Sequence, residues 1–147
     1  MKVLPGFCLL SLMIFISCSR EKRVVEESYP DGSPKRICVY NGSGADKQLI
    51  RETTYYPNKR IQMDGTYKDN QRDGQWVYWY ENGSKWSEGF FKNGKNDGKR
   101  ITYFENGKVR YEAYYKEDVR VGKWRFFDEK GQFLQEIDYS AQAGAKK

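Results

Sequence analysis

The stretch YENGSKWSEGFFKNGKNDGKRITY, Tyr80–Tyr103, is one unit of a 24-residue repeat. The unit recurs without a gap at Tyr56–Trp79 and Phe104–Phe127, and Asp128–Tyr139 begins a further copy. Residues 29–55 form a degraded first copy with a longer, irregular loop. Stacked copies usually build an extended surface instead of a pocket, so the repeat indicates binding or scaffolding.

Glycine pairs mark the turns of each copy. Asn82-Gly83 and Asn93-Gly94 predict tight hairpins, because a type I′ turn needs positive φ at both central residues. Asp73-Gly74, Asp97-Gly98 and Val121-Gly122 follow at 24-residue intervals and predict a second glycine turn in each copy. No segment keeps a helical period. We therefore expect an all-β fold, an elongated antiparallel β-meander of stacked hairpins, with no transmembrane span once a signal peptide is removed.

The first strand of each copy alternates between two sets of residues. The first set comprises Met63, Gly65 and Tyr67 and their equivalents in later copies, which are mostly small or aromatic. The opposite set carries the charge. Period two with one apolar face predicts a half-buried antiparallel strand. Because a glycine or alanine accompanies a large ring in every copy, we expect the ring of a neighbouring strand to lie over the small residue.

The second strand carries aromatic residues on both faces, so the sequence leaves open which face is packed. One interpretation is an exposed strip that binds a partner, since Trp, Tyr and Arg dominate interface hot spots. In this strip Arg100 would stack between Trp76 and Trp124. The other interpretation is that these rings are structural. The candidate binding surface is Trp76, Tyr78, Arg100, Trp124 and Phe126.

Two charged rows accompany the repeat. Carboxylates recur every 24 residues at Asp64, Glu88, Glu112 and Glu136, and lysines recur at Lys68, Lys92 and Lys116. A hydrolase would use two such carboxylates with separated pKa values. The favoured interpretation is a solvated face that discourages edge-to-edge aggregation, because a repeat copies its carboxylates without any catalytic cause.

Other catalytic sites find no support in the sequence. The chain has no histidine, which removes His-based triads and His metal clusters. We expect no catalytic residue, no metal, no cofactor and no small-molecule substrate. The net charge of +6 is interspersed along the chain, without the basic block typical of nucleic-acid binding.

The amino terminus suggests an anchor. Residues 1–17 have the length and apolar character of a signal peptide. They end in Phe15-Ile16-Ser17-Cys18, which resembles the bacterial lipobox and implies lipid attachment at Cys18. Ser19 differs from the aspartate-type retention signal, so the expected location is the bacterial cell envelope, with the outer membrane favoured. Residues 18–28 are expected to form a tether and residues 140–147 a disordered tail.

The repeat resembles the bacterial MORN-repeat family, in the variant found in YwqK-type antitoxin family proteins. The matching pieces are Tyr80–Gly83, Glu88–Gly94, Asp97–Lys99 and Asp73–Tyr80. The resemblance implies a meander that acts in protein–protein contacts, here a membrane-anchored scaffold with an immunity-like role. Alternatives are a lipid- or glycan-binding surface and, remotely, the carboxylate hydrolase. Whether the chain is a monomer or associates through open edges stays undecided.

Overall fold

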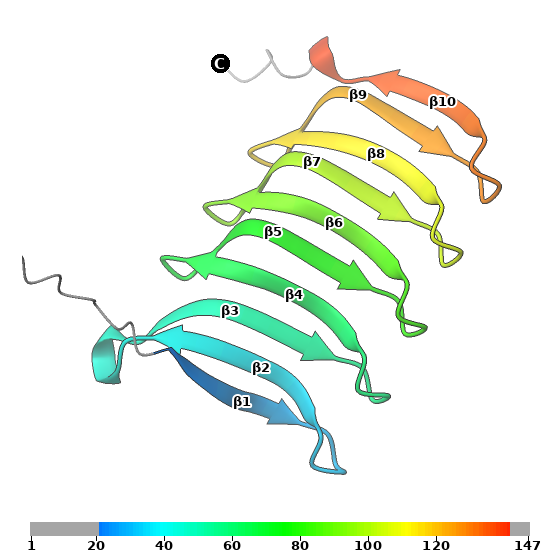
Figure 1. The fold of residues 1–147 in the computed structure, drawn as a ribbon. Coiled ribbons are helices and arrows are strands. Elements are labelled where there is room, and N and C mark those ends of the chain that lie inside the picture. The colour runs from blue at the N-terminus through cyan, green and yellow to red at the C-terminus, as the bar shows by residue number, and fades with distance from the viewer. Residues whose placement is uncertain (1–20, 142–147) are drawn as a thin grey trace, which may run out of the picture.

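Ten strands follow one another in a single antiparallel sheet, and each pairs with its neighbours in the sequence (Figure 1). The computed structural model describes residues 21–141, so the signal peptide, Cys18 and residues 142–147 lie outside the described residues. The all-β meander is confirmed. The strands are β1 (Lys22–Ser28), β2 (Pro34–Asn41), β3 (Gln48–Tyr55), β4 (Ile61–Lys68), β5 (Gln71–Trp79), β6 (Lys85–Lys92), β7 (Lys95–Tyr103), β8 (Val109–Lys116), β9 (Val119–Phe127) and β10 (Phe133–Asp138).

Two segments differ from the predicted organisation. Residues 22–28 of the expected tether form β1, because Val24 and Val25 pair with Cys38 and Ile37 of β2. The irregular loop of the first copy contains a short 3-10 helix, Gly44–Asp46. In the part of the chain that the structure describes, no helix is long and apolar enough to span a membrane.

The short turns between β4 and β5, β6 and β7, and β8 and β9 are two-residue hairpins. Asn93 and Gly94 both have positive φ, 49° and 80°, which confirms the predicted type I′ turn. At the equivalent position the next copy uses Glu117 and Asp118, with φ of 48° and 68°. A non-glycine residue at positive φ is uncommon, so the repeat imposes this turn even where the sequence lacks its preferred residues.

The turn at Asn82-Gly83 is not the type I′ hairpin that the dipeptide predicts. Gly83 has a φ of 91°, but Asn82 does not have positive φ. The backbone N–H of Gly83 donates to the carbonyl of Tyr80 at 2.9 Å, and the side-chain oxygen of Asn82 accepts from the N–H of Ser84 at 2.8 Å. Asparagine is used here for its side-chain hydrogen bond, and glycine alone supplies the left-handed residue.

The third recurring glycine of each copy lies inside a strand, and the predicted second glycine turn is therefore wrong. Gly74, Gly98 and Gly122 have φ of 87°, 119° and 62° within β5, β7 and β9. Each lies where the pairing with the preceding strand shifts register, as between Gly65 and Tyr67 of β4. A bulge bends the strand and redirects the neighbouring backbone. In β4 it leaves the Thr66 carbonyl free to accept the indole N–H of Trp76 at 3.0 Å.

The packing residues of the sheet gather on one face, which we call the aromatic face. Directly paired residues project to the same side, so Gly65, Trp76 and Gly89 share this face. The expected ring over a small residue is confirmed at Gly65, where a built Cβ would lie 2.1 Å from the Trp76 ring, but not at Gly89, where it would meet the side chain of Arg100 at 3.2 Å. The aromatic face comprises Met63, Gly65, Tyr67, Trp76, Tyr78, Ser87, Gly89, Phe91, Arg100, Thr102, Tyr111, Ala113, Tyr115, Trp124 and Phe126.

The opposite side, which we call the charged face, carries the other half of each strand. Across the middle of the sheet Asp64, Val77, Glu88, Ile101 and Glu112 pair in turn. The charged face comprises Asp64, Val77, Glu88, Phe90, Lys99, Ile101, Glu112, Tyr114, Lys123 and Arg125. A single-layer sheet therefore presents two chemically different surfaces.

Successive copies are also joined through their long turns. The hydroxyl of Tyr56 donates to the Trp79 carbonyl and that of Tyr80 to the Tyr103 carbonyl, both at 2.8 Å. Each bond links one long turn to the strand end that leads into the next long turn, where the next copy begins. Such nearest-neighbour contacts stabilise a repeat array without a thick core.

Candidate functional site

The candidate aromatic strip lies on the packed side of the sheet. The Trp76 side chain is fully buried, with 0% exposure, and Trp124 is 6% exposed. The rings of Tyr67 and Phe91 contact Trp76 edge-on, at centroid distances of 5.2 and 5.9 Å. The sequence left open whether these rings bind a partner or pack within the sheet. Both indoles pack within the sheet, and neither indole offers an accessible surface to a partner.

The cation that covers each indole is not Arg100. Its guanidinium lies over Phe91 and Tyr115, at 5.6 and 5.9 Å from the ring centroids. Trp76 is covered by Arg72 at 4.2 Å and Trp124 by Arg120 at 5.1 Å. The expected stack of Arg100 between two indoles is therefore wrong. Each indole is instead covered by an arginine from the bulged start of its own strand.

The other two members of the strip are half-buried. Tyr78 contacts the ring of Trp86 at 5.9 Å, and Phe126 contacts Tyr111 and Trp124 at 5.9 and 6.4 Å. These contacts lie within the aromatic face, so Tyr78 and Phe126 extend the packing of the indoles towards the long turns. All five residues of the candidate surface are thus brought together, as parts of one packed layer.

The carboxylate row lies on the charged face, and each member has a cationic partner. Asp64 pairs with Arg51 at 2.7 Å, Glu88 with Lys85 at 3.0 Å and Glu112 with Lys99 at 2.7 Å. Glu136 pairs with both Lys123 and Arg125, at 2.8 and 3.1 Å. Partly exposed pairs of this kind contribute little stability each, but they neutralise the row.

The lysine row lies apart from these ion pairs. Lys68, Lys92 and Lys116 are exposed at the ends of the short hairpins. Lys116 pairs with Asp97 at 2.9 Å instead of with a member of the carboxylate row. The cations that neutralise the carboxylates were not singled out by the sequence. Lys85 lies on the same strand as Glu88, and the other cations are cross-strand partners, which depend on register.

Two members of the carboxylate row, Glu88 and Glu136, have lowered pKa values. Hydrogen bonds from Tyr103 and Lys85 lower the pKa of Glu88, and bonds from Lys123 and Arg125 lower that of Glu136. A hydrolytic pair needs one carboxyl whose pKa is raised, so that it holds a proton near neutral pH. The row is therefore arranged for cross-strand pairing.

Tyr103→Phe is expected to make stability less sensitive to acid. The Tyr103 hydroxyl donates to Glu88 at 2.6 Å and lowers the Glu88 pKa below its usual 4.5. A lowered folded-state pKa stabilises the fold above pH 4.5, and this contribution is lost as the pH falls through the lowered value. The variant should therefore lose about 1 kcal/mol at pH 7 and much less at pH 3.

Urea unfolding at both pH values measures this difference. Tyr114→Phe is the matched control, because Tyr114 is an exposed tyrosine of the same face. If Tyr103→Phe loses the same free energy of unfolding at pH 7 and at pH 3, the result would contradict the role of the Glu88 carboxylate.

Sequence reasoning missed two exposed rings on the charged face. Phe90 is 47% exposed and Tyr114 is 40% exposed. They occupy the same position in successive copies, on β6 and β8, about 9.6 Å apart at two strand spacings. The equivalent residue one copy earlier is Thr66. An aromatic residue at a position otherwise grouped with charged ones was the available signal.

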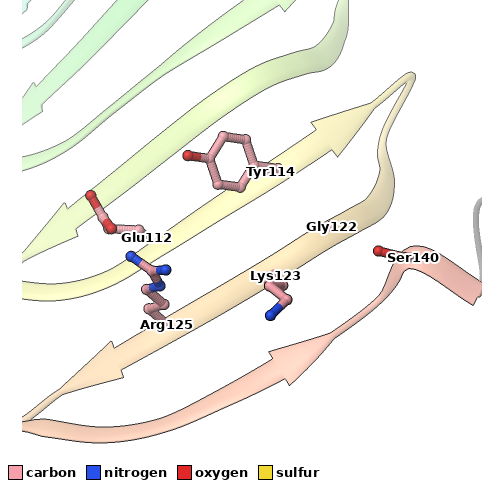
Figure 2. A pocket seen from close by; sticks show the side chains of 6 residues that line it. All are labelled: Glu112, Tyr114, Gly122, Lys123, Arg125 and Ser140. Carbon is pink, nitrogen blue, oxygen red and sulfur yellow. The ribbon is translucent and has the colours of Figure 1, made fainter.

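A hollow of about 480 Å³ lies beside Tyr114 (Figure 2). Its lining comes from β8, β9 and Ser140, which lies two residues beyond the end of β10. Figure 2 shows the Tyr114 ring, the Glu112 carboxylate and the Arg125 guanidinium around this space, and Gly122 adds no side chain to it. The lining residues are Glu112, Tyr114, Gly122, Lys123, Arg125 and Ser140.

Metal ligands and thiols are the remaining candidates for chemistry. Among residues 21–141, no three or more His, Cys, Asp or Glu side chains are grouped to hold a metal ion. Cys38 is a buried free thiol, and burial raises its pKa. A buried thiol with a raised pKa is a packing residue instead of a nucleophile.

Comparison with known proteins identifies the repeat. No curated protein matches the chain. Three consecutive stretches, residues 72–93, 96–117 and 120–141, match the MORN repeat variant. Each stretch runs from a bulged strand through a long turn into the following strand. The match covers three consecutive repeats between residues 72 and 141, and over this part the chain is similar to the MORN repeat variant.

Proposed function

We propose that this chain is a non-catalytic, membrane-anchored scaffold that binds a protein partner on its charged face. The observation that carries the proposal is the pair of exposed rings, Phe90 and Tyr114, on the face that also carries the ion-paired carboxylate row. MORN repeats often mediate binding, and the three matched repeats include both rings. An immunity-like role, in which the partner is a toxin, is the finer form of the proposal.

The chemistry around the rings favours a protein partner. Lys99 pairs directly with Tyr114 across the strands, and Gln75 pairs with Phe90. An aromatic anchor surrounded by charged groups is the usual composition of an interface hot spot and its rim. The hollow beside Tyr114 offers space for a side chain of the partner. The Glu112 carboxylate is already paired with Lys99, so the partner need not bring a matching charge.

Cys18 supplies the anchor in this proposal. Residues 19–21 alone separate it from Lys22, the first residue of β1. Attachment of lipid at Cys18 would hold the sheet close to the membrane, since two or more acyl chains give a stable anchor. Cys18→Ser is the test. Loss of labelled palmitate and of membrane retention supports the anchor, and tight retention of the unlabelled variant contradicts it.

The binding proposal is tested by photocrosslinking in cells. A photoreactive amino acid at position 114 should capture a specific protein, identified by mass spectrometry. The same amino acid at Trp86 is the control, because Trp86 is also exposed but contacts Tyr78 of the aromatic face. The captured protein is then purified and titrated against the wild type and the Phe90→Ala/Tyr114→Ala variant.

We expect the double variant to bind the purified protein at least tenfold more weakly while remaining folded. Undiminished binding would overturn the proposal for this face. Binding of the wild type to anionic vesicles or to polysaccharide, with no direct protein partner, would favour the lipid- or glycan-binding alternative and would equally overturn it.

A further inference from the structure

The two outer strands of the sheet have open edges. Among residues 21–141, no strand lies beyond β1 or β10 (Figure 1). Phe133 and Leu134 of β10 are more than half exposed, and Ile137 is 37% exposed. On β1, Val25 is 50% exposed. Unpaired strand edges with apolar side chains are a template for pairing with another chain.

The repeat determines which strand fits each edge. Two strands make one copy, so β10 is equivalent to β2, and β1 is equivalent to β3. A second molecule translated along the sheet would place its β1 beside β10 in the antiparallel orientation of the β2–β3 pair. In that pair Cys38 is opposite Glu52, and Val39 is opposite Arg51.

We propose that the open edges pair head to tail, with β10 of one molecule against β1 of the next. The β2–β3 register transferred to this junction places Asp138 opposite Arg23 on the charged face. It also places Ile137 opposite Val24 on the aromatic face. The first pair joins opposite charges and the second joins apolar side chains, both of which stabilise neighbouring strands.

Each row of the sheet continues through this junction. Asp138 pairs with Lys123, and Arg23 pairs with Val39, so both belong to the same row of the charged face. Ile137 pairs with Trp124, and Val24 pairs with Cys38, so both belong to the central row of the aromatic face. The charged face and the aromatic face of one molecule are therefore continuous with the same faces of the next.

The symmetric alternatives fit less well. Pairing β10 with a second β10 around Ile137 places Glu136 opposite Asp138, and like charges directly opposite are unfavourable. Pairing β1 with a second β1 leaves Phe133, Leu134 and Ile137 uncovered. A head-to-tail junction covers both edges of the molecule.

A head-to-tail contact generates a ring where the rotation between molecules closes and an open filament where it does not. One strand pair buries little surface, and each junction is accordingly weak. The inference is independent of the proposed partner, because neither edge includes Phe90 or Tyr114.

Thiol crosslinking of the full chain tests the junction. Arg23→Cys/Asp138→Cys, treated with a short bismaleimide, should give a ladder of dimers, trimers and longer species. The wild-type chain, treated in the same way, controls for crosslinking through the native cysteines, of which Cys38 is buried. Arg23→Cys/Phe133→Cys tests the register, because Phe133 lies at the far end of β10. Absence of the ladder, or equal ladders from both pairs, would overturn the proposal.

Charge reversal gives a second test in solution. Asp138→Lys and Arg23→Glu should each weaken self-association by about tenfold in sedimentation equilibrium, since each creates a like-charge pair. An equimolar mixture of the two variants should regain wild-type association. Dimers from Arg23→Cys alone, or a mixture that stays monomeric, would show a symmetric contact or no contact, and either result overturns the head-to-tail junction.

Discussion

Gly65→Ala is expected to lower the free energy of unfolding by about 2–3 kcal/mol. The added Cβ would lie 2.1 Å from Cδ2 of Trp76 and 2.3 Å from its Cε2, closer than non-bonded atoms approach. Trp76 is fully buried between Tyr67 and Phe91, so the indole cannot move aside without displacing both rings. Urea unfolding followed by tryptophan fluorescence measures the loss.

Gly89→Ala is the matched control, one copy later. Its Cβ would lie 3.2 Å from the Nε of Arg100 and 3.4 Å from its Cβ. A flexible arginine side chain can shift by a few tenths of an ångström, and alanine suits a strand interior better than glycine. We expect Gly89→Ala to change stability by less than about 1 kcal/mol. Equal losses in both variants would show that the indole is not the cause.

The contrast between Gly65 and Gly89 illustrates what the sequence could predict. The period of the repeat and the alternation around Gly65 were sufficient to expect a meander with rings over small residues. They were insufficient at Gly74, where a glycine with positive φ was assigned to a turn and lies in a bulge. A bulge and a turn both need the left-handed conformation, so the residue type alone does not distinguish them.

The candidate surface was harder to predict than the fold. Trp76 and Phe90 are both aromatic residues in strands, yet one is fully buried and the other is 47% exposed. Which side chain faces inward depends on the phase between neighbouring strands, and the bulges set that phase. The carboxylate row was predictable as a row, but its ion pairs depend on the same register. Rows of residues that recur with the period of the repeat could be predicted from the sequence, and contacts between neighbouring strands could not.

Trp76→Ala is expected to cost about 3–5 kcal/mol, the largest loss of any single substitution in the aromatic face. Truncation removes a fully buried indole, its edge-on contacts with Tyr67 and Phe91, and the hydrogen bond from its N–H to the Thr66 carbonyl. Loss of partner binding by this variant would therefore report unfolding. Binding and circular dichroism measured on the same sample distinguish the two effects.

The double variant Gly65→Ala/Trp76→Ala separates the contact from the individual losses. If the indole is what excludes a Cβ at Gly65, the alanine at position 65 costs nothing once the ring is gone. The two substitutions should then be non-additive, with the double variant no less stable than Trp76→Ala alone. Additive losses would place the strain of Gly65→Ala in the backbone of β4. The ring and the glycine together set how closely β4 and β5 approach, so their coupling measures the contact that every copy of the repeat reproduces in modified form.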